Sequence, residues 1–511
     1  MKHKTLTALV ALATLSTLNS QLSTAHAQGA LTPPAGAPAP VMKSLDQIEP
    51  RIPVNSLPGT NNGMFVISAP GNYYLTANIV ATAGKHGILI NAKHVKLDLN
   101  GFALIGTGAA GYHAITLLND DGGDGDYLSV RNGDIRNWDN GITFFSQRAD
   151  VIEDLRIHGC KAGINLYGVA NVRRCYIFGG AGAFYGISVT TDFVRVEDCT
   201  VNNISSASTS AAGISLEYGL VSGCLIRSVS GNPARGIQIS NPGGVVERCK
   251  VDQVYGSATG SIGIKATTVR DCTVTDGVSY ANSASATGIS AQHIERCTVK
   301  NIAGGATSGS GIGILGAASG GLVAQCLVDG VAGAGAQGVS VGTNQFSVTD
   351  TKISNITGNG SPAAGIYAGS GSWLKASGCD ITTVTNLSAA GGWGILIHGG
   401  LVERCNISGA RTVGIYANGS STVLNCSVRK CGINGNDAGI WASSAGNQVE
   451  GNSVFNCYIG IQLLPNSSGA VLRNTCGLNT VNYSVAGASA APIVTAANAG
   501  AATNPFANLS W

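Results

Sequence analysis

The segment from Asn119 to Asp126 holds the densest group of carboxylates in the chain and reads Asn-Asp-Asp-Gly-Gly-Asp-Gly-Asp. Carboxylate oxygens are preferred ligands of Ca²⁺, and glycines allow the tight turns that bring such oxygens together. We therefore predict a Ca²⁺ cofactor held by Asp121, Asp124 and Asp126. The spacing is not that of an EF-hand loop, and the alternative is a solvated acidic loop.

A second polar stretch, residues 131–141, combines carboxylates, arginines and a tryptophan. A polysaccharide lyase needs a base that takes the proton next to a uronate carboxylate and a cation that stabilises the enolate. A glycoside hydrolase needs two carboxyl groups that flank the scissile bond. Asp134, Arg136 and Asp139 could supply either set and are the candidate catalytic residues. The alternative is that they are turn residues and surface ion pairs.

Aromatic residues recur at the third position of a repeated Gly-Ile-x motif. Four consecutive copies near the C-terminus have this position filled by Tyr367, Leu396, Tyr416 and Trp441. The position should face outward, because the residues on either side of it are apolar and face inward. Earlier copies hold polar residues there: Thr143, Asn165, Ser188, Ser215, Gln238, Lys265, Ser290 and Ser340.

An exposed aromatic row on a soluble protein is typical of an interface. We predict that these aromatic side chains form a carbohydrate-binding platform with His398 at its edge. Two alternatives stay open. The C-terminal tail could cover the row with Phe506 and Trp511, or the rings could simply stack along the ladder.

The elements that must position these residues follow from the repeat, which recurs about every 25 residues. Such a period indicates a solenoid, whose units bury their apolar side chains only by stacking on one another. A second element, Val-x-x-Cys-x-[Val/Ile], lies between the copies, so each unit has two or three short β-branched segments and no room for an ordinary helix. The Gly-[Ile/Val] pairs begin at Gly87, Gly141, Gly163, Gly186, Gly213, Gly236, Gly263, Gly288, Gly313, Gly338, Gly365, Gly394, Gly414, Gly439 and Gly460.

We predict an all-β fold, a right-handed parallel β-helix of about 16 coils with about 25 residues per coil. The handedness follows because parallel crossover connections are almost always right-handed. Leucine is too sparse for a leucine-rich repeat. One interior stack is expected to hold Ile88, Ile164, Ile187, Ile237, Ile366 and Ile440.

Ten of the fourteen cysteines occupy one position of the second element. Side chains stacked in this way lie ~4.8 Å apart, which is farther than the ~3.8 Å between the Cβ atoms of a disulfide. We therefore expect most cysteines to be buried free thiols. Charges of alternating sign precede this position, as in Glu247, Arg270 and Glu295, and predict ladders of ion pairs between coils.

Three short motifs near the N-terminal end are similar to the start of secreted bacterial right-handed β-helix proteins of the pectate-lyase-like fold group. They are Pro-Gly-Asn-Tyr-Tyr-Leu at 70–75, Gly-Ile-Leu-Ile at 87–90 and Val-Lys-Leu-Asp-Leu-Asn-Gly at 95–101. The resemblance covers roughly residues 44–485 and implies the fold. It does not select an activity, because that group includes lyases, hydrolases, epimerases and non-enzymes. The pectate-lyase string Trp-Ile-Asp-His is absent.

The composition excludes several classes of protein. Of 511 residues, 11% are charged and 44% are hydrophobic, and the net charge is +3. This is not a disordered chain, and the small net charge predicts no nucleic-acid partner. Lys2 and Lys4 precede an apolar stretch that is typical of a signal peptide, and no later stretch is long enough for a transmembrane segment. The predicted organisation is a signal peptide (1–27), a proline-rich linker and N-terminal cap (28–63), the β-helix (64–485) and an alanine-rich C-terminal tail (486–511).

Together these features predict an exported protein, extracellular, at the cell surface or periplasmic, whose partner is a polysaccharide. It would bind this polysaccharide or act on it as a lyase or hydrolase, and a carbohydrate epimerase is a third activity of the same class. The alternative is a non-catalytic surface, matrix or adhesin-like solenoid. The sequence leaves open whether the chain is an enzyme.

Overall fold

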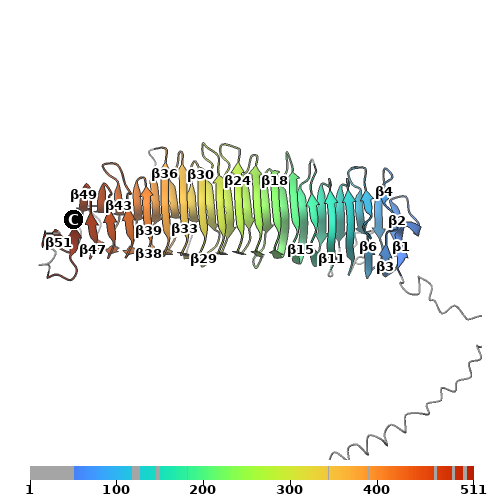
Figure 1. Cartoon of the computed structure of the whole chain (residues 1–511), viewed down its shortest axis with the longest axis horizontal. Helices are drawn as coiled ribbons and strands as arrows, with labels where there is room; N and C mark the ends of the chain where they lie inside the picture. Colours follow the sequence, from blue (N-terminus) through green and yellow to red (C-terminus); the bar gives the residue numbers. More distant parts are fainter. Residues whose placement is uncertain are drawn as a thin grey trace, which may run out of the picture. The chain divides into compact units, whose positions relative to one another are not determined.

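The Gly-Ile repeats fold into short parallel strands, and each coil of the chain stacks on the coil before it (Figure 1). The structure, a computed structural model, describes residues 51–117, 127–145, 150–180, 182–342, 345–388, 391–464, 469–485, 489–495, 497–498 and 503–511. These residues form a right-handed parallel β-helix of about 16 coils with about 25 residues per coil, which confirms the predicted fold. They include no α-helix, and so no helix among them could cross a membrane.

The strands fall into three stacks, which we name I, II and III in the order in which each coil visits them. Stack I holds the Gly-Ile strands. They are β2 (Gly63–Ile67), β5 (His86–Ile90), β8 (His113–Leu117), β10 (Asn140–Phe145), β12 (Ala162–Tyr167), β15 (Tyr185–Glu197), β17 (Ala211–Ser222), β19 (Ala234–Ile239), β22 (Ser261–Lys265), β25 (Ala286–Ala291), β28 (Gly311–Gly316), β31 (Gln337–Val341), β34 (Ala363–Ala368), β37 (Gly392–Ile397), β40 (Val413–Ala417), β43 (Ala438–Ala442), β46 (Ile459–Leu463) and β49 (Val481–Ser484).

Stack II holds the strands that lead up to the cysteine position, together with the second halves of β15 and β17. It comprises β1 (Ile52–Pro53), β3 (Gly71–Tyr74), β6 (Val95–Asp98), β9 (Ser129–Arg136), β11 (Asp150–His158), β13 (Ala170–Arg173), β20 (Val245–Glu247), β23 (Thr268–Arg270), β26 (His293–Glu295), β29 (Gly321–Ala324), β32 (Phe346–Thr349), β35 (Leu374–Ser377), β38 (Gly400–Glu403), β41 (Ser421–Leu424), β44 (Asn447–Glu450), β47 (Gly469–Leu472) and β50 (Ser489–Ala490). A 3-10 turn, η1 (Val54–Ser56), follows β1.

Stack III follows the cysteine position and takes the ends of β9 and β11. It comprises β4 (Ile79–Val80), β7 (Ala103–Ile105), β14 (Tyr176–Phe178), β16 (Thr200–Ser205), β18 (Leu225–Gly231), β21 (Lys250–Gly256), β24 (Thr273–Ser279), β27 (Thr298–Ala303), β30 (Leu327–Gly333), β33 (Lys352–Gly358), β36 (Asp380–Asn386), β39 (Asn406–Ala410), β42 (Ser427–Arg429), β45 (Ser453–Phe455), β48 (Thr475–Gly477), β51 (Ile493–Thr495) and β52 (Asn508–Ser510).

The interior stack lies where the repeat predicts it. Each isoleucine of the Gly-Ile motif pairs in register with that of the next coil, as Ile214 does with Ile237 and Ile237 with Ile264. The six predicted members of the stack, Ile88, Ile164, Ile187, Ile237, Ile366 and Ile440, are all fully buried, at 0% exposure.

The C-terminal tail differs from its prediction. Strands β50, β51 and β52 add to the stacks, so the β-helix continues past residue 485. Asn508 takes the cysteine position of its coil, where its Oδ1 accepts a hydrogen bond from the backbone N–H of Asn474 at 3.1 Å. The sequence of this last turn contains no Gly-Ile pair. Asn508 extends a column of hydrogen-bonded asparagines, and the segment before it lacks the repeat.

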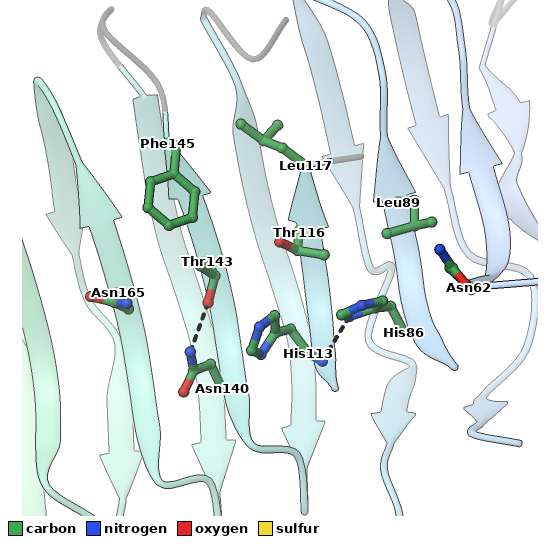
Figure 2. A pocket seen from close by; sticks show the side chains of 10 residues that line it. All are labelled: Asn62, His86, Leu89, His113, Thr116, Leu117, Asn140, Thr143, Phe145 and Asn165. Atoms are coloured by element: carbon green, nitrogen blue, oxygen red, sulfur yellow. Dashed lines mark hydrogen bonds between the residues drawn. The ribbon is translucent and has the colours of Figure 1, made fainter. Parts of the chain in front are cut away.

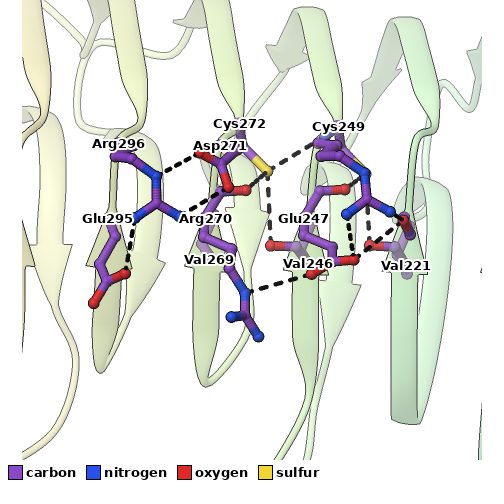
Figure 3. Close-up of polar contacts among 12 residues, drawn as sticks. Val221, Val246, Glu247, Cys249, Val269, Arg270, Asp271, Cys272, Glu295 and Arg296 are labelled. Atoms are coloured by element: carbon purple, nitrogen blue, oxygen red, sulfur yellow. Dashed lines mark hydrogen bonds and ion pairs between the residues drawn. The ribbon is translucent and has the colours of Figure 1, made fainter.

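The cysteine position forms a column of buried thiols. All fourteen cysteines are buried and free, which agrees with the expectation that most lack a disulfide. Cys272 is typical, because its thiol donates to the carbonyl of Arg270, two residues earlier, at 3.1 Å (Figure 3). Thr351 makes the same contact in its coil, with its Oγ1 donating to the carbonyl of Thr349 at 2.9 Å. The position therefore selects a small side chain with a donor rather than a disulfide partner.

Ion pairs between coils lie beside this column (Figure 3). Arg296 pairs with Asp271 of the preceding coil at 2.7 Å, and Arg270 with Glu247 at 3.4 Å. Register places Glu247, Arg270 and Glu295 next to one another, as the alternating charges predict. These side chains belong to the surface of the β-helix and are not gathered into a site.

The glycine of the Gly-Ile motif is required by the close approach of neighbouring coils. A Cβ atom on Gly236 would lie 2.5 Å from the carbonyl oxygen of Gly263 and would also meet Val251 Cγ1. Real Cβ atoms do not approach backbone this closely, so a larger residue must push the two coils apart.

Replacing this glycine should destabilise the fold. We expect Gly236→Ala to lower the free energy of unfolding by about 1–3 kcal/mol, because the new methyl group overpacks a rigid backbone contact. Urea unfolding measures the change. Gly342→Ala is the matched control, because a Cβ there meets no atom within 4 Å. Equal stabilities of the two variants would contradict the close-approach argument.

Four buried thiols outside the cysteine column are expected to make the free energy of unfolding depend on pH in the alkaline range. Burial raises the pKa of Cys160 and Cys457 to about 11 and that of Cys431 and Cys476 to about 12. A thiol in the unfolded chain ionises near pH 8.5, so the unfolded state loses protons that the folded state keeps. Their stabilising contribution is complete below about pH 8.5 and is lost as the pH rises toward these folded values.

We therefore expect the urea midpoint to fall between about pH 8 and about pH 10. In Cys431→Ala the midpoint should be lower at about pH 8, because the variant leaves a cavity, but its further fall should be smaller than that of the wild type. The same fall in both proteins would show that the Cys431 thiol does not contribute to it.

Candidate functional site

The predicted aromatic row is a continuous column on the outer face of stack I. Tyr367 in β34 pairs in register with Leu396 in β37, Leu396 with Tyr416 in β40, and Tyr416 with Trp441 in β43. Parallel pairing holds neighbouring strands about 4.8 Å apart. The four side chains therefore follow one another along the axis of the β-helix.

This column forms one wall of a groove of about 600 Å³. The walls also contain His398 and the small or polar side chains of neighbouring coils. None of the lining residues is Asp, Glu, Lys or Arg. We call this site the aromatic groove, and it is lined by Ser310, Gly335, Gln337, Ser361, Pro362, Tyr367, Gly391, Trp393, Leu396, His398, Thr412, Tyr416 and Trp441.

Three rings form the centre of the groove. Trp393 and Tyr416 are stacked, with 6.0 Å between their centroids and 29° between their planes. Trp441 meets Tyr416 edge-on, at 5.6 Å and 76°. Rings in these two arrangements hold each other in place and present both a flat face and an edge to a ligand.

Trp393 is the residue that the sequence analysis missed. Trp393 lies immediately before Gly394 and Ile395 of the motif. It pairs in register with Ala364 and Val413 in the neighbouring coils. Strict alternation back from the inward Ile395 would turn this position inward. Trp393 faces the groove because a Cβ on Gly394 would also point into the interior, against Ile407, so two consecutive positions face inward. Alternation therefore gave no signal for this second outward column.

Two polar groups of the groove have defined hydrogen-bonding capacity. The Nδ1 of His398 lies 3.0 Å from the carbonyl oxygen of Ala368. A carbonyl can only accept, so Nδ1 carries the proton and Nε2 of the neutral ring is an acceptor. The indole Nε1–H of Trp441 is buried and has no hydrogen-bond partner among the described residues. The groove therefore offers the imidazole acceptor of His398 beside its rings, whereas the indole N–H of Trp441 lies below the surface.

The side chains of the outward column are more buried than their outward-facing position in the motif predicts. Leu396 is only 3% exposed, and Thr143, Ser188, Ser290 and Ser340 are also buried. Leu396 lies between the larger side chains of Tyr367 and Tyr416, which cover it. It forms the floor of the groove rather than part of an exposed row.

The alternative in which the tail covers the aromatic row is wrong for the described part of the tail. Phe506 lies 5.5 Å from the guanidinium of Arg473, and the backbone N–H of Trp511 donates to the carbonyl of Cys476. Phe506 and Trp511 remain 47% and 61% exposed and do not line the groove. The aromatic groove is open at these positions.

The three candidate catalytic residues do not converge on a pocket. Asp134 and Arg136 lie two positions apart in β9 and form an ion pair with each other. Asp139 pairs instead with Lys161, at 2.8 Å, and accepts a hydrogen bond from the backbone N–H of Gly111 at 2.8 Å. None of the three lines the aromatic groove or the N-terminal pocket described below.

The environment of Asp139 keeps it ionised. Burial by itself would raise the pKa of this carboxyl, but the hydrogen bonds from Lys161 and Gly111 outweigh burial and lower it. A general acid needs the opposite shift. Asp134, Arg136 and Asp139 stay predicted catalytic residues, and in this geometry each carboxylate already has a cation as its partner.

A second pocket, of about 320 Å³, lies on stack I near the N-terminal end (Figure 2). We call it the N-terminal pocket. Its lining is amide, hydroxyl and imidazole groups with a few apolar side chains: Asn62, His86, Leu89, His113, Thr116, Leu117, Asn140, Thr143, Phe145 and Asn165. Asn140 Nδ2 donates to Thr143 Oγ1 at 3.1 Å, and the backbone N–H of His113 donates to His86 Nδ1 at 3.0 Å.

The predicted Ca²⁺ ligands Asp121, Asp124 and Asp126 lie outside the described residues. Within the residues that are described, no group of three His, Cys, Asp or Glu side chains could hold a metal ion.

Residues 393–498, which include part of the aromatic groove, match the family model described as a right handed beta helix region. The chain thus has the right-handed parallel β-helix fold both by this match and by its structure. No curated protein matches it in sequence.

Among solved structures, the Dettilon tailspike protein is similar at 14% identity and a TM-score of 0.20, over 79% of this chain and 63% of the tailspike. This chain therefore spans less than two thirds of the tailspike's length. The Azotobacter vinelandii mannuronan C-5 epimerase AlgE6 A-module is similar at 14% identity and a TM-score of 0.14, over 90% of this chain and 99% of that module. At such scores neither likeness carries an argument about what this chain does.

Proposed function

We propose that this protein binds a polysaccharide of uncharged sugars through the aromatic groove, outside the cell or in the periplasm. The observation that carries the proposal is the cluster of Trp393, Tyr416 and Trp441 rings in a groove without charged side chains. Sugar rings have apolar faces that pack on aromatic rings and hydroxyl groups that bind donors and acceptors, and the groove offers both.

The charge of the groove favours uncharged sugars over uronates. A buried or half-buried carboxylate needs a cation or several donors close to it, and the lining contains neither Lys nor Arg. The same lining contains no carboxylate pair, so the groove has the groups for binding and lacks those for two-carboxylate hydrolysis. Export rests on the predicted signal peptide, residues 1–27.

Affinity gel electrophoresis tests the proposal with a panel of polymers: galactomannan, xyloglucan and mixed-linkage β-glucan as uncharged chains, polygalacturonate and alginate as acidic ones. We expect retention on at least one uncharged polymer and none on the acidic ones. Tyr416→Ala and Trp441→Ala should weaken that binding by about tenfold or more, because central aromatic side chains carry much of the energy of such interfaces.

The matched control is Trp373→Ala, which removes a tryptophan that is 47% exposed and lies outside the groove. Its retention should equal that of the wild type. Equal retention of all four proteins would overturn the proposal, and so would retention on the acidic polymers alone. No retention on any polymer would favour the alternative of a structural or adhesin-like solenoid.

A further inference from the structure

We infer that the N-terminal pocket and the aromatic groove bind one and the same polysaccharide chain, which lies along the outer face of stack I between them. This inference rests on the proposed function and adds to it a second binding site and a minimum chain length. It is carried by the chemistry of the N-terminal pocket, by a further pocket on the face between the two sites, and by register.

The N-terminal pocket has the groups that recognise sugar hydroxyls. Asn62 and Asn165 lie at its opposite ends (Figure 2), and neither amide makes a hydrogen bond within the described part of the chain. An amide side chain both donates and accepts, as a hydroxyl group does. At one edge the Phe145 ring stacks on Tyr167 with 4.4 Å between centroids, which gives a sugar ring an apolar surface.

A third pocket lies on the same face, in coils between the N-terminal pocket and the aromatic groove. It has a volume of about 290 Å³, and its lining includes Ser240, Lys265, Ser290 and Gln292. Lys265 and Ser290 belong to the outward column of stack I that also contains Thr143 and Tyr416. A ligand confined to the aromatic groove would leave this pocket empty, whereas a long chain of hydroxylated sugars along the face covers all three.

Register sets the length that such a chain must have. Counted along the paired column, Thr143 and Tyr416 are eleven coil steps apart. At ~4.8 Å per step the two sites are about 50 Å apart. Two sites on one rigid face that engage one polymer raise its affinity by about 10²–10⁴ over a fragment that reaches only one of them.

The experiment compares polymers with fragments of about six sugar units, which are too short to span about 50 Å. Galactomannan, xyloglucan and mixed-linkage β-glucan are used whole and as such fragments, and binding is measured by titration calorimetry. The variants are the double change Asn62→Ala with Asn165→Ala, Trp441→Ala, and the control Asn202→Ala, an asparagine of β16 on stack III.

We expect the double variant to bind the polymer at least about tenfold more weakly while it binds the fragment as the wild type does, because only the second site is lost. Trp441→Ala should weaken both, and Asn202→Ala neither. Unchanged polymer binding in the double variant, with weakened binding in Trp441→Ala, overturns this inference and leaves the proposed function intact. A loss confined to the double variant, or no binding of any probe, overturns both.

Discussion

Register between parallel coils is the constraint on which the rest of this structure depends. A coil of about 25 residues cannot enclose its own apolar side chains, and it becomes stable only when its isoleucines meet those of the next coil. A slip of one residue would turn every inward side chain outward. The close approach of Gly236 to the carbonyl of Gly263 strengthens this constraint, because a Cβ on Gly236 would collide with that carbonyl oxygen and the first of the two coils must carry glycine there.

Register also explains why the candidate site lies on the outer columns of stack I. The inward positions must stay apolar in every coil, whereas the outward positions between them can vary without loss of the core. When neighbouring coils place rings at one outward position, the backbone brings those rings within contact distance, as it does for Tyr416 and Trp441 at 5.6 Å. The β-helix is thus a scaffold that converts a repeat in sequence into a row of side chains in space.

The sequence was sufficient for the features that recur in every coil. The parallel β-helix, the interior isoleucines and the alignment of Tyr367, Tyr416 and Trp441 all follow from one period. Features that occur once were harder to predict. Trp393 occupies an outward column that the motif does not mark, and Leu396 is buried by the size of its neighbours rather than by its own position.

The same reasoning explains the other differences. The last coil is built around Asn508 after a segment without the motif, so the period could not show that the tail joins the stacks. The partners of Asp139, which are Lys161 and the backbone of Gly111, come from neighbouring coils and turns whose geometry the period does not determine. Residue types suggested chemistry there, but only the positions of the partners show that the carboxylate is already paired.

The distribution of charge separates the structural surface of the β-helix from its binding surface. Opposite charges are useful beside the thiol column, where register places Arg270 between Glu247 and Glu295 and each sign meets its opposite. In the aromatic groove a charge would have no such partner and would have to lose its water when a ligand covered it. An uncharged sugar chain avoids that cost, since it exchanges water at its hydroxyls for the amide, hydroxyl and imidazole groups of the groove. The absence of charge among the groove residues is therefore a property of the site and argues, with the rings, for a ligand that is long, hydroxylated and uncharged.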